Sequence, residues 1–131
     1  MKEYHLSYDV TDADLYEPTK VKEHIVAHLY AKDVLGIESP VGSTLVFKDT
    51  STRDVDDWIT ILQTELNTDL RNIIYFDISS TEIIGATIQS TSYTEKDALG
   101  KKSTKFEEFQ SLLKRVRDNL PEKLHTNYPN R

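Results

Sequence analysis

The chain has 131 residues, no cysteine and a net charge of −6. This length suffices for one domain with its own core and is too short for two. Without cysteine, disulfides and thiolate metal ligands or nucleophiles are excluded. No run of about eighteen apolar residues occurs, and the amino-terminal segment lacks a signal-peptide pattern, so we expect a soluble, cytoplasmic protein that does not enter the membrane.

Charge is distributed unevenly along the chain. Residues 1–100 hold 8 Lys and Arg against 18 Asp and Glu, a net charge of −10, and residues 101–131 hold 8 against 4, a net charge of +4. An acidic body argues against a large phosphate-binding surface, because phosphate contacts need clustered cations. The basic end either binds nucleic acid or packs on the acidic body of its own or a partner chain, and we favour packing.

The first predicted element is a strand over residues 4–10. Strict alternation gives it an apolar face and a polar face. The apolar face comprises Tyr4, Leu6, Tyr8 and Val10, and the polar face comprises His5, Ser7 and Asp9. The apolar face is suited to packing against helices, which leaves an imidazole, a hydroxyl and a carboxylate in a row on the other.

A helix and two strands are predicted next. The helix fits residues 18–34, with Gly36 as its stop signal. Strands are predicted at residues 37–40 and 43–48, joined by a turn around residues 40–42 that contains proline and glycine.

The second helix has the clearest amphipathic pattern. Ser51 or Thr52 is predicted to cap it. Its apolar face comprises Val55, Trp58, Ile59, Leu62 and Leu66. A strand is predicted at residues 72–78, with Ile73, Tyr75 and Asp77 on the side opposite Ile74, Phe76 and Ile78.

The remaining elements are one more strand over residues 82–88, a polar connector over residues 89–103 and a third helix over about residues 104–120. Thr104 and Glu107 are predicted to form a capping box at the start of this helix. Pro121 is expected just beyond its end.

The order of the first six elements is β-α-β-β-α-β, which predicts an α+β fold with a ferredoxin-like antiparallel sheet. An extra strand and a carboxy-terminal helix follow. We expect a domain over residues 1–90, then a linker and helical extension over residues 91–131. One sheet face would lack helices, and exposed apolar groups there predict that a second protomer or the third helix covers it.

Three stretches carry a family resemblance: the opening strand ending in Tyr8-Asp9-Val10, residues 38–47, and the following helix with the strand ending at residues 73–78. Together they resemble the CRISPR-associated protein-two family and its VapD-like ribonuclease relatives, over about residues 1–90. The resemblance implies a homodimer in which Asp9 lies near its mate across the interface. In active members such carboxylates are thought to hold a divalent metal that cleaves phosphodiesters, while other members serve only as a structural bridge in the spacer-integration complex.

Asp9 is therefore the candidate catalytic and metal-binding residue, with Mg²⁺ as the expected cofactor. Mg²⁺ binds one or two carboxylates together with waters and substrate phosphate, and a twofold axis would supply the second carboxylate. The alternative is a strand-end Asp that caps a loop or pairs with a cation. His5 and Ser7 share its face and are candidate assisting groups.

Two other pairs of residues are weighed and set aside. Asp77 resembles Asp9 in its setting, but if both carboxylates end antiparallel strands, seven residues at roughly 3.3 Å each separate them by about 20 Å. His24 and His28 have the i, i+4 spacing of a zinc-binding pair. We favour helix packing for them, because they border the apolar stripe of that helix.

The sequence thus predicts a homodimeric, metal-dependent phosphodiesterase, an endonuclease acting on RNA or DNA. The rival prediction, from a different class, is a non-catalytic dimeric scaffold that uses the same face.

Overall fold

A computed structural model describes residues 1–10, 18–41, 43–66, 74–82 and 104–124. Its core is a four-stranded antiparallel sheet in the order β2-β3-β1-β4 with helices packed against it, so the chain has an α+β fold. The strands are β1 (Lys2–Val10), β2 (Leu35–Val41), β3 (Thr44–Asp49) and β4 (Ile74–Glu82). The helices are α1 (Pro18–Ala31), α2 (Val55–Thr64), α5 (Thr104–Asp118) and α6 (Leu120–Leu124).

The predicted alternation of β1 is confirmed. Tyr4, Leu6 and Tyr8 are buried against the helices, whereas Ser7 and Asp9 are exposed on the other side. Two aromatic rings extend the buried layer: Tyr4 stacks on Phe47 of β3 at 5.4 Å between centroids, and the edge of Trp58 meets both rings. Burying such large side chains supplies much of the free energy that holds the sheet to its helices.

Helix α1 ends earlier than predicted, at Ala31, and Gly36 is not its stop. The chain turns at Asp33, which adopts the left-handed conformation with φ 60°. The amide of Val34 then donates to the carbonyl of Leu29. Asp tolerates this conformation better than most residues with a side chain, and one left-handed residue after the last turn is a common way to end a helix.

The predicted cap of α2 is also wrong. The N-cap is Asp54, whose carboxylate accepts from the amide of Asp57, while the Asp57 carboxylate accepts from the amide of Asp54. This reciprocal pair satisfies two of the amide groups that a helix start leaves unpaired. Ser51 instead accepts from the amide of Arg53 in the preceding turn.

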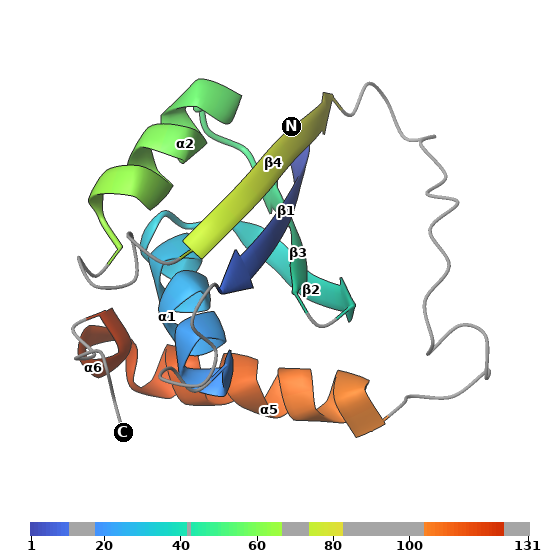
Figure 1. Ribbon diagram of the computed structural model, residues 1–131, viewed down its shortest axis with the longest axis vertical. Helices are drawn as coiled ribbons and strands as arrows, with labels where there is room; N and C mark the ends of the chain where they lie inside the picture. The colour runs from blue at the N-terminus through green and yellow to red at the C-terminus, as the bar shows by residue number, and fades with distance from the viewer. Residues whose placement is uncertain (11–17, 42, 67–73, 83–103, 125–131) are drawn as a thin grey trace.

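The third helix is in two parts. α5 ends at Asp118, so Pro121 lies beyond its end as predicted, but inside a second, short helix, α6, at a first-turn position that suits proline. Figure 1 shows α5 crossing beside α1, on the helix side of the molecule. Of the two alternatives for covering the helix-free sheet face, the third helix is therefore wrong. Its apolar stripe, with Phe109, Leu113 and Val116 buried, joins the core through α1 and β2 instead.

Several predicted features lie outside the described residues. They are residues 83–88 of the strand predicted over 82–88, the connector over residues 89–103, Ile73, the turn at Gly42 and the Thr104 capping side chain. Glu82, the first residue of that predicted strand, instead ends β4. Among the helices that the structure does describe, none is long and apolar enough to cross a lipid bilayer.

Candidate functional site on the open sheet face

The sheet surface turned away from α1 and α2 is called the open face here. It carries the exposed side chains of Ser7 and Asp9 from β1 and of Tyr75 and Asp77 from β4. The β1–β4 register pairs Asp9 with Tyr75 and Ser7 with Asp77. Directly opposed residues on one face have Cβ atoms about 5 Å apart, so these four side chains form one contiguous patch.

The predicted separation of about 20 Å between Asp9 and Asp77 is wrong. β4 does not end near Asp77 but continues to Glu82, so Asp77 lies in its first half. In the observed register Asp77 is opposite Ser7 and hence diagonal to Asp9. Diagonal neighbours across an antiparallel pair lie about 7–8 Å apart. Two carboxylates of one protomer therefore lie close together on the open face, where the sequence analysis had placed them far apart.

The candidate assisting groups lie further along β1. Ser7 Oγ is 3.2 Å from Thr44 Oγ1 of β3, so its hydroxyl already has a partner on the neighbouring strand. His5 is half-buried, and its Nε2 lies 3.7 Å from Oε1 of Glu3. Four residues of extended chain put His5 about 13 Å from Asp9. His5 is thus nearer to Asp77, to which it is diagonal, than to Asp9.

The chemistry of the open face fits a hard cation better than zinc. No three His, Asp or Glu side chains gather into a metal-binding group within the described ranges. Structural zinc sites need four protein ligands and catalytic ones usually three. Mg²⁺ needs less, because it keeps several waters and uses one or two carboxylates. Asp9 and Asp77 supply that number of carboxylates.

His24 and His28 are packed inside the protein, in agreement with the favoured helix-packing interpretation. They are 1% and 6% exposed, and their rings meet edge-on at 4.5 Å between centroids. His28 Nδ1 lies 3.0 Å from the carbonyl oxygen of His24, and His24 Nδ1 lies 3.1 Å from that of Lys123 in α6. Each imidazole thus has a backbone partner, and both belong to the contact between α1 and the carboxy-terminal helices.

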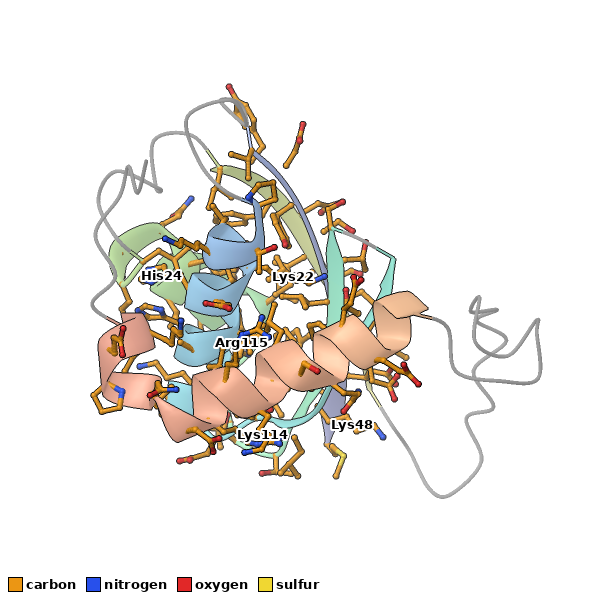
Figure 2. The ribbon with its side chains drawn as sticks, turned by 90° about the horizontal axis from the view of Figure 1, so that it is seen from below. Lys22, His24, Lys48, Lys114 and Arg115 are labelled. Carbon is orange, nitrogen blue, oxygen red and sulfur yellow. The ribbon has the colours of Figure 1, made fainter. Side chains whose placement is uncertain are left out.

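Part of the basic carboxy-terminal region pairs with the acidic body. The Glu23 carboxylate of α1, only 6% exposed, lies 3.1 Å from the Arg115 guanidinium and 2.8 Å from Lys123 Nζ. Figure 2 shows α5 lying across α1 with Arg115 over it. Lys114 pairs instead with Asp118 along α5, at 2.6 Å. The contacts of Arg115 and Lys123 with Glu23 agree with the packing that we favoured for the basic end.

A buried polar cluster that was not predicted from the sequence lies beneath the end of β3. Asp49 is 2% exposed, and its carboxylate accepts from Trp58 Nε1 at 3.0 Å, Arg53 Nε at 3.1 Å and the amide of Ser51 at 2.9 Å. Burial acts to raise the pKa of Asp49, but the hydrogen bonds from Ser51 and Arg53 and the Arg53 charge outweigh it, so the pKa is lowered. An Asp followed two residues later by Ser is a turn signal that points to this cluster.

This cluster also connects the sheet to the turn before α2. The Tyr4 hydroxyl donates to the carbonyl of Arg53 at 2.9 Å, and the Arg53 guanidinium donates to the carbonyl of Lys32 after α1. The hydrogen bonds of this cluster are therefore all made to groups of the fold itself. The cluster lies beneath the sheet and not on the open face. We assign it a structural role.

Comparison with protein-family models, with curated protein sequences and with solved structures finds no match to this chain. The resemblance to the CRISPR-associated protein-two family therefore stays a prediction, and function is inferred from the residues of the open face itself.

Proposed function

We propose that the protein is a metal-dependent phosphodiesterase that cleaves RNA or DNA as a homodimer, with Asp9 as the principal metal-binding and catalytic carboxylate. The observation that carries this proposal is the position of Asp77, diagonal to Asp9 on the open face. Each protomer thereby offers two neighbouring carboxylates, and a twofold-related copy would add two more.

The proposed cofactor is Mg²⁺, held by Asp9 and Asp77 together with waters and substrate phosphate. When bound, such a metal supplies an activated water and neutralises charge on the phosphate. The contribution of the two Asp residues is the fixed spacing of their carboxylates. Asp9 and Asp77 lie on neighbouring strands joined by a continuous register, so their spacing is fixed by the backbone and not by a loop.

Homodimer formation through the open face is supported by the exposed aromatic surface beside the carboxylates. Tyr75 is 71% exposed on a sheet surface that no described helix covers. Large exposed apolar groups rimmed by polar ones commonly mark association surfaces. A copy placed here would shield Tyr75 and bring the second pair of carboxylates near the first.

We further propose that the fold is a variant of the ferredoxin-like arrangement, extended by α5 and α6. Two helical crossovers support this assignment. α1 connects β1 to β2 with β3 between them, and α2 connects β3 to β4 with β1 between them. Such interleaved crossovers leave one sheet face free of helices, which is the face where the candidate site lies.

The test compares cleavage of single-stranded and duplex RNA and DNA by the purified protein in Mg²⁺ or Mn²⁺. Asp9→Asn is expected to remove cleavage without lowering the urea midpoint of unfolding, because Asp9 is exposed. Asp77→Asn is expected to weaken cleavage, and Asp118→Asn, an exposed carboxylate on α5, serves as the matched control. Cleavage that persists in Asp9→Asn rules out the proposed site.

A second candidate function is a non-catalytic dimeric scaffold that uses the same face. It is favoured by the exposure of Tyr75 and by the lack of a three-ligand group among the described side chains. Under this alternative no metal-dependent cleavage occurs, whereas Tyr75→Glu converts a dimer to a monomer in sedimentation velocity. Cleavage that depends on Asp9 would exclude it.

A further inference from the structure

The two edges of the sheet differ in how they are protected. β2 carries Pro40 and shifts register against β3 between Leu35 and Glu38 and again between Glu38 and Val41. β4 runs for nine residues in unbroken register with β1 and contains neither proline nor lysine. Proline, lysine and bulges are the usual devices that prevent other chains from pairing with an edge strand. In the described residues β4 has none of them, and its only strand partner is β1.

The direction of the backbone groups of β4 follows from the ladder. The amide of Tyr8 donates to the carbonyl of Ser43 at 3.0 Å, on the β3 side of β1. Backbone groups alternate in direction along a strand, so the odd-numbered residues of β1 turn theirs toward β4. Ser7 and Asp77, which face each other in the register, therefore form a hydrogen-bonded pair.

The even-numbered residues of β4 consequently point their backbone groups away from the sheet. Away from the two ends of the strand these are Phe76, Ile78 and Ser80, and each presents an N–H and a C=O at the outer edge. Three residues with outward donors and acceptors, spaced two apart, match the hydrogen-bonding pattern of an incoming antiparallel strand.

The two sides of this edge differ in chemistry. On the helix side is a partly open cavity of about 250 Å³ lined by Leu62, Gln63, Ile74, Tyr75 and Phe76. On the open-face side are the exposed Asp77 and, diagonal to it, Asp9. Side chains of an added strand alternate between these two sides. An apolar side chain would fit the cavity, and a basic one would lie beside Asp77.

We propose that the β4 edge binds an extended segment of a partner protein by strand addition, and that this segment alternates apolar with basic residues. In such recognition the main-chain hydrogen bonds provide affinity and the alternate side chains provide specificity. The charge of β4 indicates which kind of segment binds at its edge. β4 itself carries Asp77 and Glu82 and no cation, so a second copy of β4 lacks the complementary charge that a basic segment has. The proposal does not depend on phosphodiesterase activity.

The experiment measures binding of a fluorescein-labelled nine-residue peptide of alternating Lys and Val by anisotropy. Ser80 is exposed and its N–H points outward, so Ser80→Pro removes one edge donor and places a ring at the edge while sparing the β1 ladder. We expect Ser80→Pro to weaken binding about tenfold or more. The matched control Ser80→Ala keeps the N–H and should bind like the unmodified protein.

A second measurement uses the unmodified protein, so the proposal stays testable if the proline variant folds poorly. Amide hydrogen exchange at Phe76, Ile78 and Ser80 should slow when the peptide is added, while the amides of Asp77 and Ser79, already paired with β1, should not change. Equal binding of a peptide with its Lys and Val residues in separate blocks would overturn strand addition. Outward amides that are protected by protein concentration alone would assign the edge to a second copy and overturn the proposed occupant.

Discussion

Replacing Asp49 by Asn tests how the sheet, the turn after β3 and α2 are held together. The side chain keeps its shape but loses the charge that Arg53 pairs with, and it cannot accept from Trp58, Arg53 and Ser51 as a carboxylate does. Removing one partner of a buried ion pair costs about 3–5 kcal/mol. Because the Arg53 side chain is 26% exposed and can regain some hydration, we expect the lower end, about 3 kcal/mol.

Urea unfolding followed by circular dichroism measures this loss, with Asp9→Asn as the control. Asp9 is exposed on the sheet, so its replacement should change the free energy of unfolding by less than about 0.5 kcal/mol. For a domain of this size 3 kcal/mol lowers Tm by about 10 °C. A loss below about 1 kcal/mol for Asp49→Asn, equal to that of the control, would show that the cluster does not stabilise the fold as argued.

Other predictions concern the same cluster and the helix contact. Because the folded-state pKa of Asp49 lies below the ordinary Asp value of about 3.8, its ionisation stabilises the fold above about pH 4, and this contribution is lost as the pH falls through the folded-state pKa. The difference in urea midpoint between the unmodified protein and Asp49→Asn should therefore shrink between pH 7 and pH 3; an unchanged difference contradicts the assigned pKa direction. Tyr4→Phe removes the hydrogen bond to the Arg53 carbonyl and should cost about 1 kcal/mol in the same assay, with a null effect counting against that bond. Glu23→Gln leaves Arg115 and Lys123 without their shared carboxylate and should cost about 2 kcal/mol, with faster amide exchange in α5 and with Glu108→Gln as an exposed control; equal effects of the two would refute the pairing.

The parts of the fold that could be predicted are those in which apolar residues recur at a regular spacing along the sequence. Alternation over residues 4–10 placed Asp9 and Tyr4 on opposite faces of β1 correctly, because a strand has a period of two wherever it pairs. The amphipathic stripe of α2 was equally informative. By contrast, the residue that caps α2 could not be predicted, because Ser51, Thr52 and Asp54 all have capping side chains. The choice depends on where the chain leaves the turn that Asp49 organises.

The candidate site could be predicted only in part, because its second carboxylate depends on a strand boundary. Asp77 was placed at the end of its strand, and β4 instead extends to Glu82. A shift of a few residues at a strand end moves two side chains from opposite edges to neighbouring positions, and propensity does not determine such ends well. Likewise, the stripe of α5 predicted an apolar face without specifying the surface that it covers. That surface is formed by α1, partly through the buried Glu23, and by β2.

The proposed metal site is tested most directly by locating a bound metal ion on the protein. Mn²⁺ added to ¹⁵N-labelled protein broadens the amide signals of residues close to the ion. We predict that broadening centres on Ser7, Asp9 and Asp77 of the open face and disappears in the Asp9→Asn, Asp77→Asn double variant. Broadening centred on the acidic start of α2 at Asp54 and Asp57, or broadening unchanged in the double variant, would contradict a metal site between β1 and β4.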